Sequence, residues 1–378
     1  MNNRVYKYFF YEFFSYFIVV LFAISAIIWT IQAVNFLDLV TEDGHAFKVY
    51  FFYSILILPK VITKLIPITF LIALIITITK MDKDNELIVL WTSGLNKINL
   101  VNLIFRISLI ITVLQIIFAC VISPETLNYS RNLIKNSQLD FIPSLLKERR
   151  FNDTVKDLTI FVNKKNSDGS FDHIFIEDNG NVLTKVANVN LKETSVIFAK
   201  SGYIADDDKN LFLFNGSIQK RNNLGKVSVI KFEKTIINLS KLTTKTATAP
   251  KIQETSTFDL IMCLSKNISE LQNCNLSNQY QKNLKIEINK RFGTAFYIPT
   301  IALIICFLLS SRKDKKIYTY NKYIFGFISF AILTGAEITV RYSGNSLNHS
   351  LTYYLTPIIL LPITYLLLLR TFKYENLN

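Results

Sequence analysis

The stretch ITKMDKDNELIVLWTSGLNK (78–97) lies between two long apolar runs and decides how the chain is organised. Charges crowd its first part, where five of the seven residues from 80 to 86 are Lys, Asp or Glu. Leu87, Leu90, Trp91 and Gly94 then recur at the spacing of one helix face. This ridge is too short to cross a bilayer, which needs about 20 apolar residues as a helix. The stretch therefore predicts a water-facing loop, with a short amphipathic helix at about 82–95, between two membrane spans.

Apolar runs on both sides of this loop predict six membrane-spanning helices. The chain of 378 residues is 50% hydrophobic and 19% charged, whereas soluble domains carry roughly 25% charged residues. The run at 49–79 is too long for one span, and Pro59 offers a break, so we interpret 46–58 as an interfacial helix. The predicted spans are 13–37, 60–79, 98–122, 292–310, 323–340 and 351–369.

The distribution of Lys and Arg predicts which side each loop faces. Short cytoplasmic loops carry an excess of these residues, and one side of the predicted spans holds twelve of them, against Lys48 and Arg341 on the other. We therefore expect both termini in the cytoplasm and the insert at 124–291 outside it. The basic side carries Arg4, Lys7, Lys80, Lys83, Lys97, Arg312, Lys313, Lys315, Lys316, Lys322, Arg370 and Lys373.

The insert between the third and fourth spans has the pattern of β structure followed by helix. Short strands with turns at about ten-residue spacing suggest a sandwich, a jelly roll or a curved open sheet. Residues 258–271 and 279–292 are amphipathic and predict helices that lead into the fourth span. The predicted strands are LTIFVN (158–163), HIFIED (173–178), VIFAKSGYIA (196–205), LFLFNGSIQK (211–220) and VSVIKFEKTIINL (227–239).

Two of the four cysteines bear on the compartment of the insert. Cys120 and Cys306 fall inside apolar spans, and we interpret them as core residues. Cys263 and Cys274 lie in the insert, and an oxidising compartment would allow them to form a disulfide. We expect two free thiols there, with the disulfide as the alternative.

Motifs for catalysis and cofactor binding are absent from the sequence. The sequence contains no Walker A, HExxH or GxSxG pattern. His45, His173 and His349 do not pair with one another at the spacing of metal ligands. We therefore expect no catalytic residue, no metal and no cofactor, and ATP hydrolysis would need a separate chain.

Charged residues within the spans are candidates for a substrate cavity. Glu337 is the only carboxylate inside a predicted span, and Arg341 lies four residues later, so the two can pair on one helix face. The pair is either a neutral structural element or a polar part of a cavity. Lys60 and Lys64 also share a face, and as helix they lie about 30 and 24 Å from the level of Lys80. They either snorkel to the interface or contact an anionic ligand.

Four segments resemble the LptF/LptG permeases of the lipopolysaccharide export ABC transporter, and the layout of three spans, an insert and three spans is similar as well. The first two segments look more like the F subunit. The sequence departs from the family pattern at Gly293-Thr294-Ala295, where a proline is usual, and at the bulky Trp91. The segments are LPKVITKLIPITFLIAL (58–74), DNELIVLWTSGLNK (84–97), IFAKSGYIADDDKNLFLFNGSIQK (197–220) and KIEINKRFGTAFYIPTIALIICFLL (285–309).

The resemblance implies a polytopic α-helical membrane protein of the bacterial inner membrane. Residues 1–123 and 292–378 would hold three transmembrane helices each, and 124–291 a periplasmic β-jellyroll domain. Such a permease extracts lipopolysaccharide from the inner membrane and passes it to a periplasmic bridge. The implied partners are lipopolysaccharide, a cytoplasmic ABC ATPase dimer (LptB-like), a paired permease (LptG-like) and periplasmic jellyroll proteins (LptC/LptA-like), with no nucleic acid.

The resemblance also implies roles for individual residues. Residues 84–97 would be the coupling helix, in which Glu86 pairs with a basic group of the ATPase. Leu87, Leu90, Trp91 and Gly94 would form the face that docks onto the ATPase. Lipid A phosphates would lie at the depth of Lys60 and Lys64.

Two other function classes remain open. A membrane-embedded enzyme that modifies lipids or polymers would need a convergent set of His and carboxylate side chains, which the sequence does not offer. A scaffold that tethers a periplasmic β domain would need one span, whereas six are predicted.

Overall fold

The computed structural model of the chain describes residues 2–41, 46–136, 148–153, 158–166, 168–179, 194–205, 210–221, 227–238, 251–265, 274, 277–310 and 317–375. The chain forms two compact units, each with a hydrophobic core of its own. The first unit, which is helical, comprises Met1–Thr30, Ile57–Asn128 and Pro250–Asn378. The second comprises Ile31–Leu56 and Tyr129–Ala249 and contains the sheet.

Among the described residues, six helical segments are long and apolar enough to cross a membrane, which confirms the predicted number of spans. These segments are Arg4–Thr41, Phe47–Lys83, Lys97–Ile134, Asn278–Leu309, Tyr323–Tyr342 and Leu347–Lys373. The helices within and between them are α1 (Asn2–Asn35), α2 (Asp38–Thr41), α3 (Phe47–Leu56), α4 (Leu58–Lys83), α5 (Glu86–Thr92), α6 (Lys97–Ile117), the π-helix η1 (Phe118–Ile122), α7 (Ser123–Asn136), the 3₁₀ helix η4 (Ile252–Glu254), α9 (Thr257–Ser265), α10 (Asn278–Ile305), the 3₁₀ helix η5 (Cys306–Leu309), α11 (Ile317–Tyr342) and α12 (Leu347–Glu375).

The helix break expected at Pro59 separates α3 from α4. Pro59 lies in the first turn of α4, where a missing N–H costs no intrahelical hydrogen bond. At its other end α4 continues past the predicted limit at residue 79. Its last turn contains Lys80 and Lys83, and cations are favourable at a helix C-terminus. Lys80 also forms an ion pair with Glu12 of α1.

The third span continues beyond its predicted end at residue 122. The helix passes from α6 through the π-helical turn η1 into α7, which ends at Asn136. Pro124 does not stop the helix: the π-helical turn η1 directly precedes α7, and the Cys120 carbonyl that loses its backbone N–H accepts a hydrogen bond from Thr257. The insert thus begins as an extension of the span, and no loop separates the two.

Within the described helices, Pro67, Pro124, Pro299, Pro357 and Pro362 each leave a carbonyl without its backbone N–H, and at the first four a side-chain donor from another segment lies within hydrogen-bond distance of that carbonyl. A helical proline has no N–H for the carbonyl four residues earlier, which would otherwise stay unpaired. These bonds connect α6 to α4, α9 to η1, α6 to α10 and α10 to α12. Gln115 Nε2 donates to the Thr63 carbonyl (2.9 Å), which Pro67 leaves free, and Thr257 Oγ1 donates to the Cys120 carbonyl, which Pro124 leaves free. Thr112 Oγ1 lies 3.4 Å from the Ala295 carbonyl, which Pro299 leaves free, and Tyr297 Oη donates to the Tyr353 carbonyl (2.8 Å), which Pro357 leaves free.

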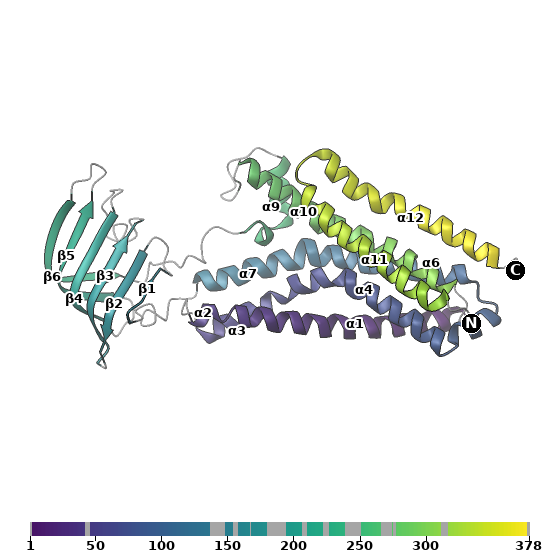
Figure 1. Ribbon diagram of the computed structural model, residues 1–378, viewed down its shortest axis with the longest axis horizontal. Coiled ribbons are helices and arrows are strands. Elements are labelled where there is room, and N and C mark those ends of the chain that lie inside the picture. Colours follow the sequence, from purple (N-terminus) through teal and green to yellow (C-terminus); the bar gives the residue numbers. More distant parts are fainter. Residues whose placement is uncertain are drawn as a thin grey trace. The chain divides into compact units, whose positions relative to one another are not determined.

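Helix α10 occupies the centre of the first unit and contacts α4, α6, α11 and α12 (Figure 1). In an apolar 18-residue stretch of its span, 78% of the residues are buried. In the corresponding stretches of the spans that contain α1, α11 and α12, 11%, 17% and 22% of the residues are buried. Contact between α10 and α12 is close at Gly293, where an added Cβ would lie 2.1 Å from the ring of Tyr353. The outer helices therefore keep apolar faces for lipid or for another membrane protein.

The second unit contains a six-stranded antiparallel sheet in sequence order (Figure 1). The five predicted strands are confirmed, and a short strand precedes them. One face of the sheet is buried by a cluster that includes Ile160, Ile174 and Leu213. The strands are β1 (Phe151–Asn152), β2 (Leu158–Lys165), β3 (Ser170–Asp178), β4 (Thr194–Ile204), β5 (Asn210–Arg221) and β6 (Val227–Asn238).

Cys263 of α9 and Cys274 form a disulfide, so the expectation of two free thiols is wrong. Their Cα atoms lie 6.0 Å apart, within the range that a disulfide requires. Sequence spacing alone left this pairing undecided because it does not fix the distance between the two Cα atoms. Cys120 and Cys306 are free and at least partly buried, as expected for residues within spans.

Candidate functional site

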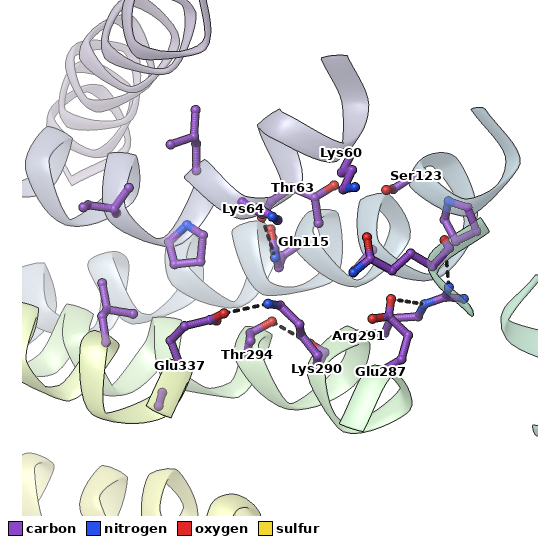
Figure 2. A pocket seen from close by; sticks show the side chains of 18 of the residues that line it. Lys60, Thr63, Lys64, Gln115, Ser123, Glu287, Lys290, Arg291, Thr294 and Glu337 are labelled. Carbon is purple, nitrogen blue, oxygen red and sulfur yellow. Dashed lines mark hydrogen bonds and ion pairs between the residues drawn. The ribbon is translucent and has the colours of Figure 1, made fainter. Parts of the chain in front are cut away.

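A cavity of about 400 Å³ lies within the first unit (Figure 2). Its walls come mainly from α4, α7, α10 and α11, with contributions from α6, η1 and η4. Because these segments are far apart in sequence, only the packing of the spans creates the site. The lining comprises the cations Lys60, Lys64, Lys290 and Arg291, the acids Glu287 and Glu337, the polar residues Thr63, Gln115, Ser123, Gln253, Thr294 and Thr334, and the apolar residues Leu65, Pro67, Ile68, Ala119, Pro124, Leu127, Phe330, Leu333 and Ala336.

Lys60 and Lys64 of α4 both line this cavity, on the wall opposite the charged residues of α10 and α11 (Figure 2). They stand one helical turn apart, as their spacing predicted. Neither ammonium group forms an ion pair with any residue in the described part of the chain. Lys60 is half-buried, and a charge that is partly removed from water is costly unless a counter-charge approaches it, whereas Lys64 is exposed. This wall of the cavity is therefore suited to an anion.

The opposite wall carries an ion pair that the sequence did not predict. Lys290 of α10 donates to Glu337 of α11, with Nζ and Oε1 2.6 Å apart (Figure 2). The expected pair between Glu337 and Arg341 is absent from the described residues. Arg341 lies in the last turn of α11, where its side chain is exposed. A neighbouring helix thus provides a nearer cation for Glu337 than its own helix does.

Arg291 has a structural role at the edge of the cavity. Its side chain is only 3% exposed, and its Nε donates to Glu287 one turn earlier in α10 (3.2 Å). Nη1 donates to Thr257 (2.8 Å), while Nη2 donates to the carbonyls of Gln253 (3.2 Å) and Thr255 (3.1 Å). A guanidinium group has five N–H donors, and these bonds use most of them. Arg291 therefore fixes the segment before α9 against α10, and few of its donors remain for a ligand.

The remainder of the lining is largely apolar. Leu65, Ile68, Leu127, Phe330 and Leu333 supply aliphatic and aromatic surface beside the charged groups. A cavity with apolar walls and a few localised polar groups is typical of a ligand site. The combination suits an amphiphile that has both an acyl portion and an anionic group.

The predicted coupling segment forms the short helix α5, and most of its predicted contact residues face inward. Leu87 is buried in the core, and Leu90 and Trp91 pack against the same cluster. The ammonium of Lys97 lies 5.7 Å from the centre of the Trp91 ring. Glu86 accepts a hydrogen bond of 2.9 Å from the hydroxyl of Tyr8. The apolar ridge seen in the sequence therefore holds α5 against its own chain.

A different face of α5 is open to a partner. Ile88 and Val89 are 48% and 63% exposed, and Thr92 and Gly94 are exposed as well. Gly94 follows the helix with φ of +87°, a conformation that glycine adopts without steric cost. The sequence did not distinguish the two faces because both carry apolar residues at helical spacing.

Sequence reasoning missed the charged side chains that α10 contributes. Glu287, Lys290 and Arg291 stand at three- and four-residue spacing immediately before an apolar span. Charged groups at that position are costly in a membrane and tend to be functional or paired. Their spacing could have identified them as cavity residues. Gln115 is uncharged, and the sequence has no charged residue three or four positions from it that would mark it as part of a site.

Comparisons with known proteins agree with this architecture. The chain matches the family "Lipopolysaccharide export system permease LptF/LptG" over residues 7–370. It is also 29% identical over 238 residues to "Uncharacterized protein RP871" of Rickettsia prowazekii (strain Madrid E). That alignment covers 62% of this chain and 62% of the relative.

Proposed function

Because the chain belongs to the LptF/LptG family of lipopolysaccharide export permeases, we propose that it is the F-type permease of an ABC transporter that extracts lipopolysaccharide from the inner membrane. The chain would bind the lipid and pass it to a periplasmic bridge of jellyroll proteins. A cytoplasmic ATPase dimer would supply the energy, since the sequence has no Walker A motif.

The observation that carries this proposal is the pair Lys60 and Lys64, which form no ion pair among the described residues and line a cavity that also has apolar walls. Lys60 and Lys64 would bind phosphate groups of the lipid, while Leu65, Ile68 and Phe330 would contact its acyl portion. A fully soluble anion would gain nothing from the apolar walls, and a neutral lipid would leave two cations without a counter-charge. The cavity therefore favours an acidic lipid over either.

The weakly buried spans support a second permease as a partner. Helices α1 and α11 expose large apolar side chains, among them Phe22, Ile27, Phe327 and Ile338. A paired G-type permease or lipid would cover these faces, and small shifts there would admit the substrate laterally.

The distribution of charge and the disulfide support the orientation. The basic loops favour the cytoplasm for both termini, and the Cys263–Cys274 bond is typical of an oxidising compartment. We therefore assign the sheet and α9 to the periplasmic side, and α5 to the cytoplasm, where its exposed face and Glu86 would meet the ATPase.

The double substitution Lys60→Ala with Lys64→Ala tests the proposal. We expect photo-crosslinking of lipopolysaccharide to the cavity wall, and export in proteoliposomes, to fall roughly tenfold or more. Each charge-assisted hydrogen bond contributes about 1.5–3 kcal/mol, and 1.4 kcal/mol corresponds to a factor of about ten. Lys60→Arg with Lys64→Arg keeps the charge and should retain most of the signal.

Lys48→Ala is the matched control, because this exposed lysine of α3 does not line the cavity. If the double alanine variant crosslinks and exports like wild type, the two lysines do not bind the substrate and the proposal loses its main support.

A further inference from the structure

A second hollow, of about 470 Å³, lies on the outer face of the sheet. Its floor is a row of paired residues on neighbouring strands, in which Phe161 faces Phe175, Phe175 faces Phe198, and Phe198 faces Ser217. The rings of Phe175 and Phe198 lie 5.2 Å apart, and the Phe198 side chain is 42% exposed. Exposed aromatic faces in a shared hollow are unusual for a solvated sheet surface.

The rim of the hollow is polar and positively charged. His173, Lys200, Asn215 and Lys231 line it and are exposed, and none of the described residues that line it is a carboxylate. Lys200 and Lys231 form no ion pair with a residue that the structure describes. An anion in the hollow would therefore meet two ammonium groups and no carboxylate among the described lining residues.

The backbone of three adjacent strands is arranged to form this rim. Core-facing residues normally recur every second position along a strand, but here the step is three, from Phe171 to Ile174 in β3 and from Ala199 to Gly202 in β4. In β5 the same step runs from Leu213 to Gly216, at the same level. The irregularity therefore crosses the sheet as one line.

Two non-glycine residues adopt the left-handed conformation along this line. His173 has φ of +52° and Asn215 has φ of +49°, and both line the hollow on either side of Lys200. Positive φ is uncommon outside glycine and costs of order 1 kcal/mol, so it concentrates at sites where the surrounding structure enforces it. This backbone conformation places the His173 ring, the Lys200 ammonium and the Asn215 amide together beside the aromatic floor.

We propose that this hollow on the outer face of the sheet binds an anionic saccharide. The aromatic rings of Phe175 and Phe198 would pack against the C–H face of a sugar ring, since the face of an aromatic ring is negative. His173, Asn215 and Ser217 would hydrogen-bond sugar hydroxyls, and Lys200 and Lys231 would bind its phosphate or carboxylate. An acyl chain would leave this polar rim unsatisfied, and a bare anion would leave the aromatic floor exposed.

The choice of a saccharide rests on the proposed function, because lipopolysaccharide joins a glycan to its lipid. The outer face of the sheet would hold the glycan, whereas the membrane cavity would hold the acidic lipid. The two sites have no lining residue in common, so each can be tested while the other is intact.

The test is isothermal titration calorimetry on the full chain in nanodiscs. The probe is the water-soluble phosphorylated oligosaccharide released from lipopolysaccharide by mild acid, which carries no acyl chain. We expect wild type to bind it. Lys200→Glu with Lys231→Glu, and separately Phe175→Ala with Phe198→Ala, should each weaken binding by roughly tenfold or more. Lys164→Glu with Lys220→Glu makes the same change in net charge outside the hollow and should bind like wild type.

Two further titrations distinguish this site from the membrane cavity and from a simple anion site. Lys60→Ala with Lys64→Ala should keep oligosaccharide affinity, so a failure of the proposed export function would not remove this binding. Inorganic phosphate should not bind at concentrations at which the oligosaccharide saturates the protein. Equal affinity of wild type and the Lys200/Lys231 variant, or equal affinity for inorganic phosphate and oligosaccharide, would overturn the proposal. Unchanged thermal unfolding of each variant shows that the sheet remains folded.

Discussion

At the scale of single residues, Gly293 allows close packing between α10 and α12. The ring of Tyr353 occupies the space that any side chain at 293 would need. Tyr353 is fully buried, and its neighbour Tyr297 caps the carbonyl freed by Pro357. The contact between Gly293 and Tyr353 thus joins α10 and α12 beside the proline-freed carbonyl of α12. A side chain larger than hydrogen at position 293 would push the two helices apart.

Gly293→Ala should therefore destabilise the first unit. The new methyl group would lie within about 2 Å of the Tyr353 ring, and overpacking of this kind costs roughly 1–3 kcal/mol. Thermal unfolding in detergent measures the loss. Gly335→Ala, in α11, has nothing within 4 Å of the added Cβ and should not lower stability. Adding Tyr353→Leu to Gly293→Ala should recover part of the loss, and no recovery would contradict a steric clash at this contact.

The proline carbonyls give a second prediction at this scale. Gln115→Leu would leave the Thr63 carbonyl without its donor, and a buried unpaired polar group costs about 1–3 kcal/mol. We expect a lower unfolding temperature in detergent. Pro67→Ala restores a backbone N–H to that carbonyl, so the double variant Pro67→Ala with Gln115→Leu should be more stable than Gln115→Leu alone. The opposite order would show that the hydrogen bond has no stabilising effect.

At the scale of secondary-structure elements, the seven-residue helix α5 has two apolar faces with different roles. One face, with Leu87, Leu90 and Trp91, is packed into the core and fixes the helix on the spans. The other, with Ile88 and Val89, is exposed. A helix that transmits movement between two proteins needs both, since a force passes only through contacts on each side.

Substitutions on the two faces of α5 should have separable effects. Val89→Lys places a charge on the exposed face, so we expect loss of co-purification with a candidate ABC ATPase and unchanged thermal unfolding. Leu87→Ala creates a cavity in the core and should lower stability by about 2–5 kcal/mol. Glu86→Ala should also weaken ATPase association or coupled activity. If Val89→Lys retains the ATPase while Trp91→Ala loses it without unfolding, the docking face is the one predicted from sequence.

At the scale of the whole molecule, the disulfide and the basic loops both bear on topology. A bond between Cys263 and Cys274 persists only where thiols are not kept reduced. Full-length protein isolated under denaturing conditions should therefore expose two maleimide-reactive thiols, Cys120 and Cys306, and four after reduction. Four reactive thiols before reduction would indicate that the insert faces the cytoplasm, contrary to the proposed orientation. Replacing both Cys263 and Cys274 by Ser provides the control with two thiols under either condition.

The sequence alone determined the number of spans, the five main strands and the placement of Lys60 and Lys64 on one face of a helix. These follow from local patterns: the length of an apolar run is set by the thickness of a bilayer, and alternation with period two or 3.6 is set by backbone geometry. The break at Pro59 has the same local origin, because a proline acts on the helix that contains it.

The tertiary structure decided which side chains meet. Glu337 pairs with Lys290 and not with Arg341, the buried face of α5 is the one predicted to dock, and Cys263 is bonded to Cys274. Gln115 and Tyr297 look like isolated polar residues in apolar spans until the prolines of neighbouring helices supply their carbonyl partners. Each of these outcomes depends on the distance between atoms of separate segments. A local pattern restricts that distance, but only the packing of the spans and strands fixes it.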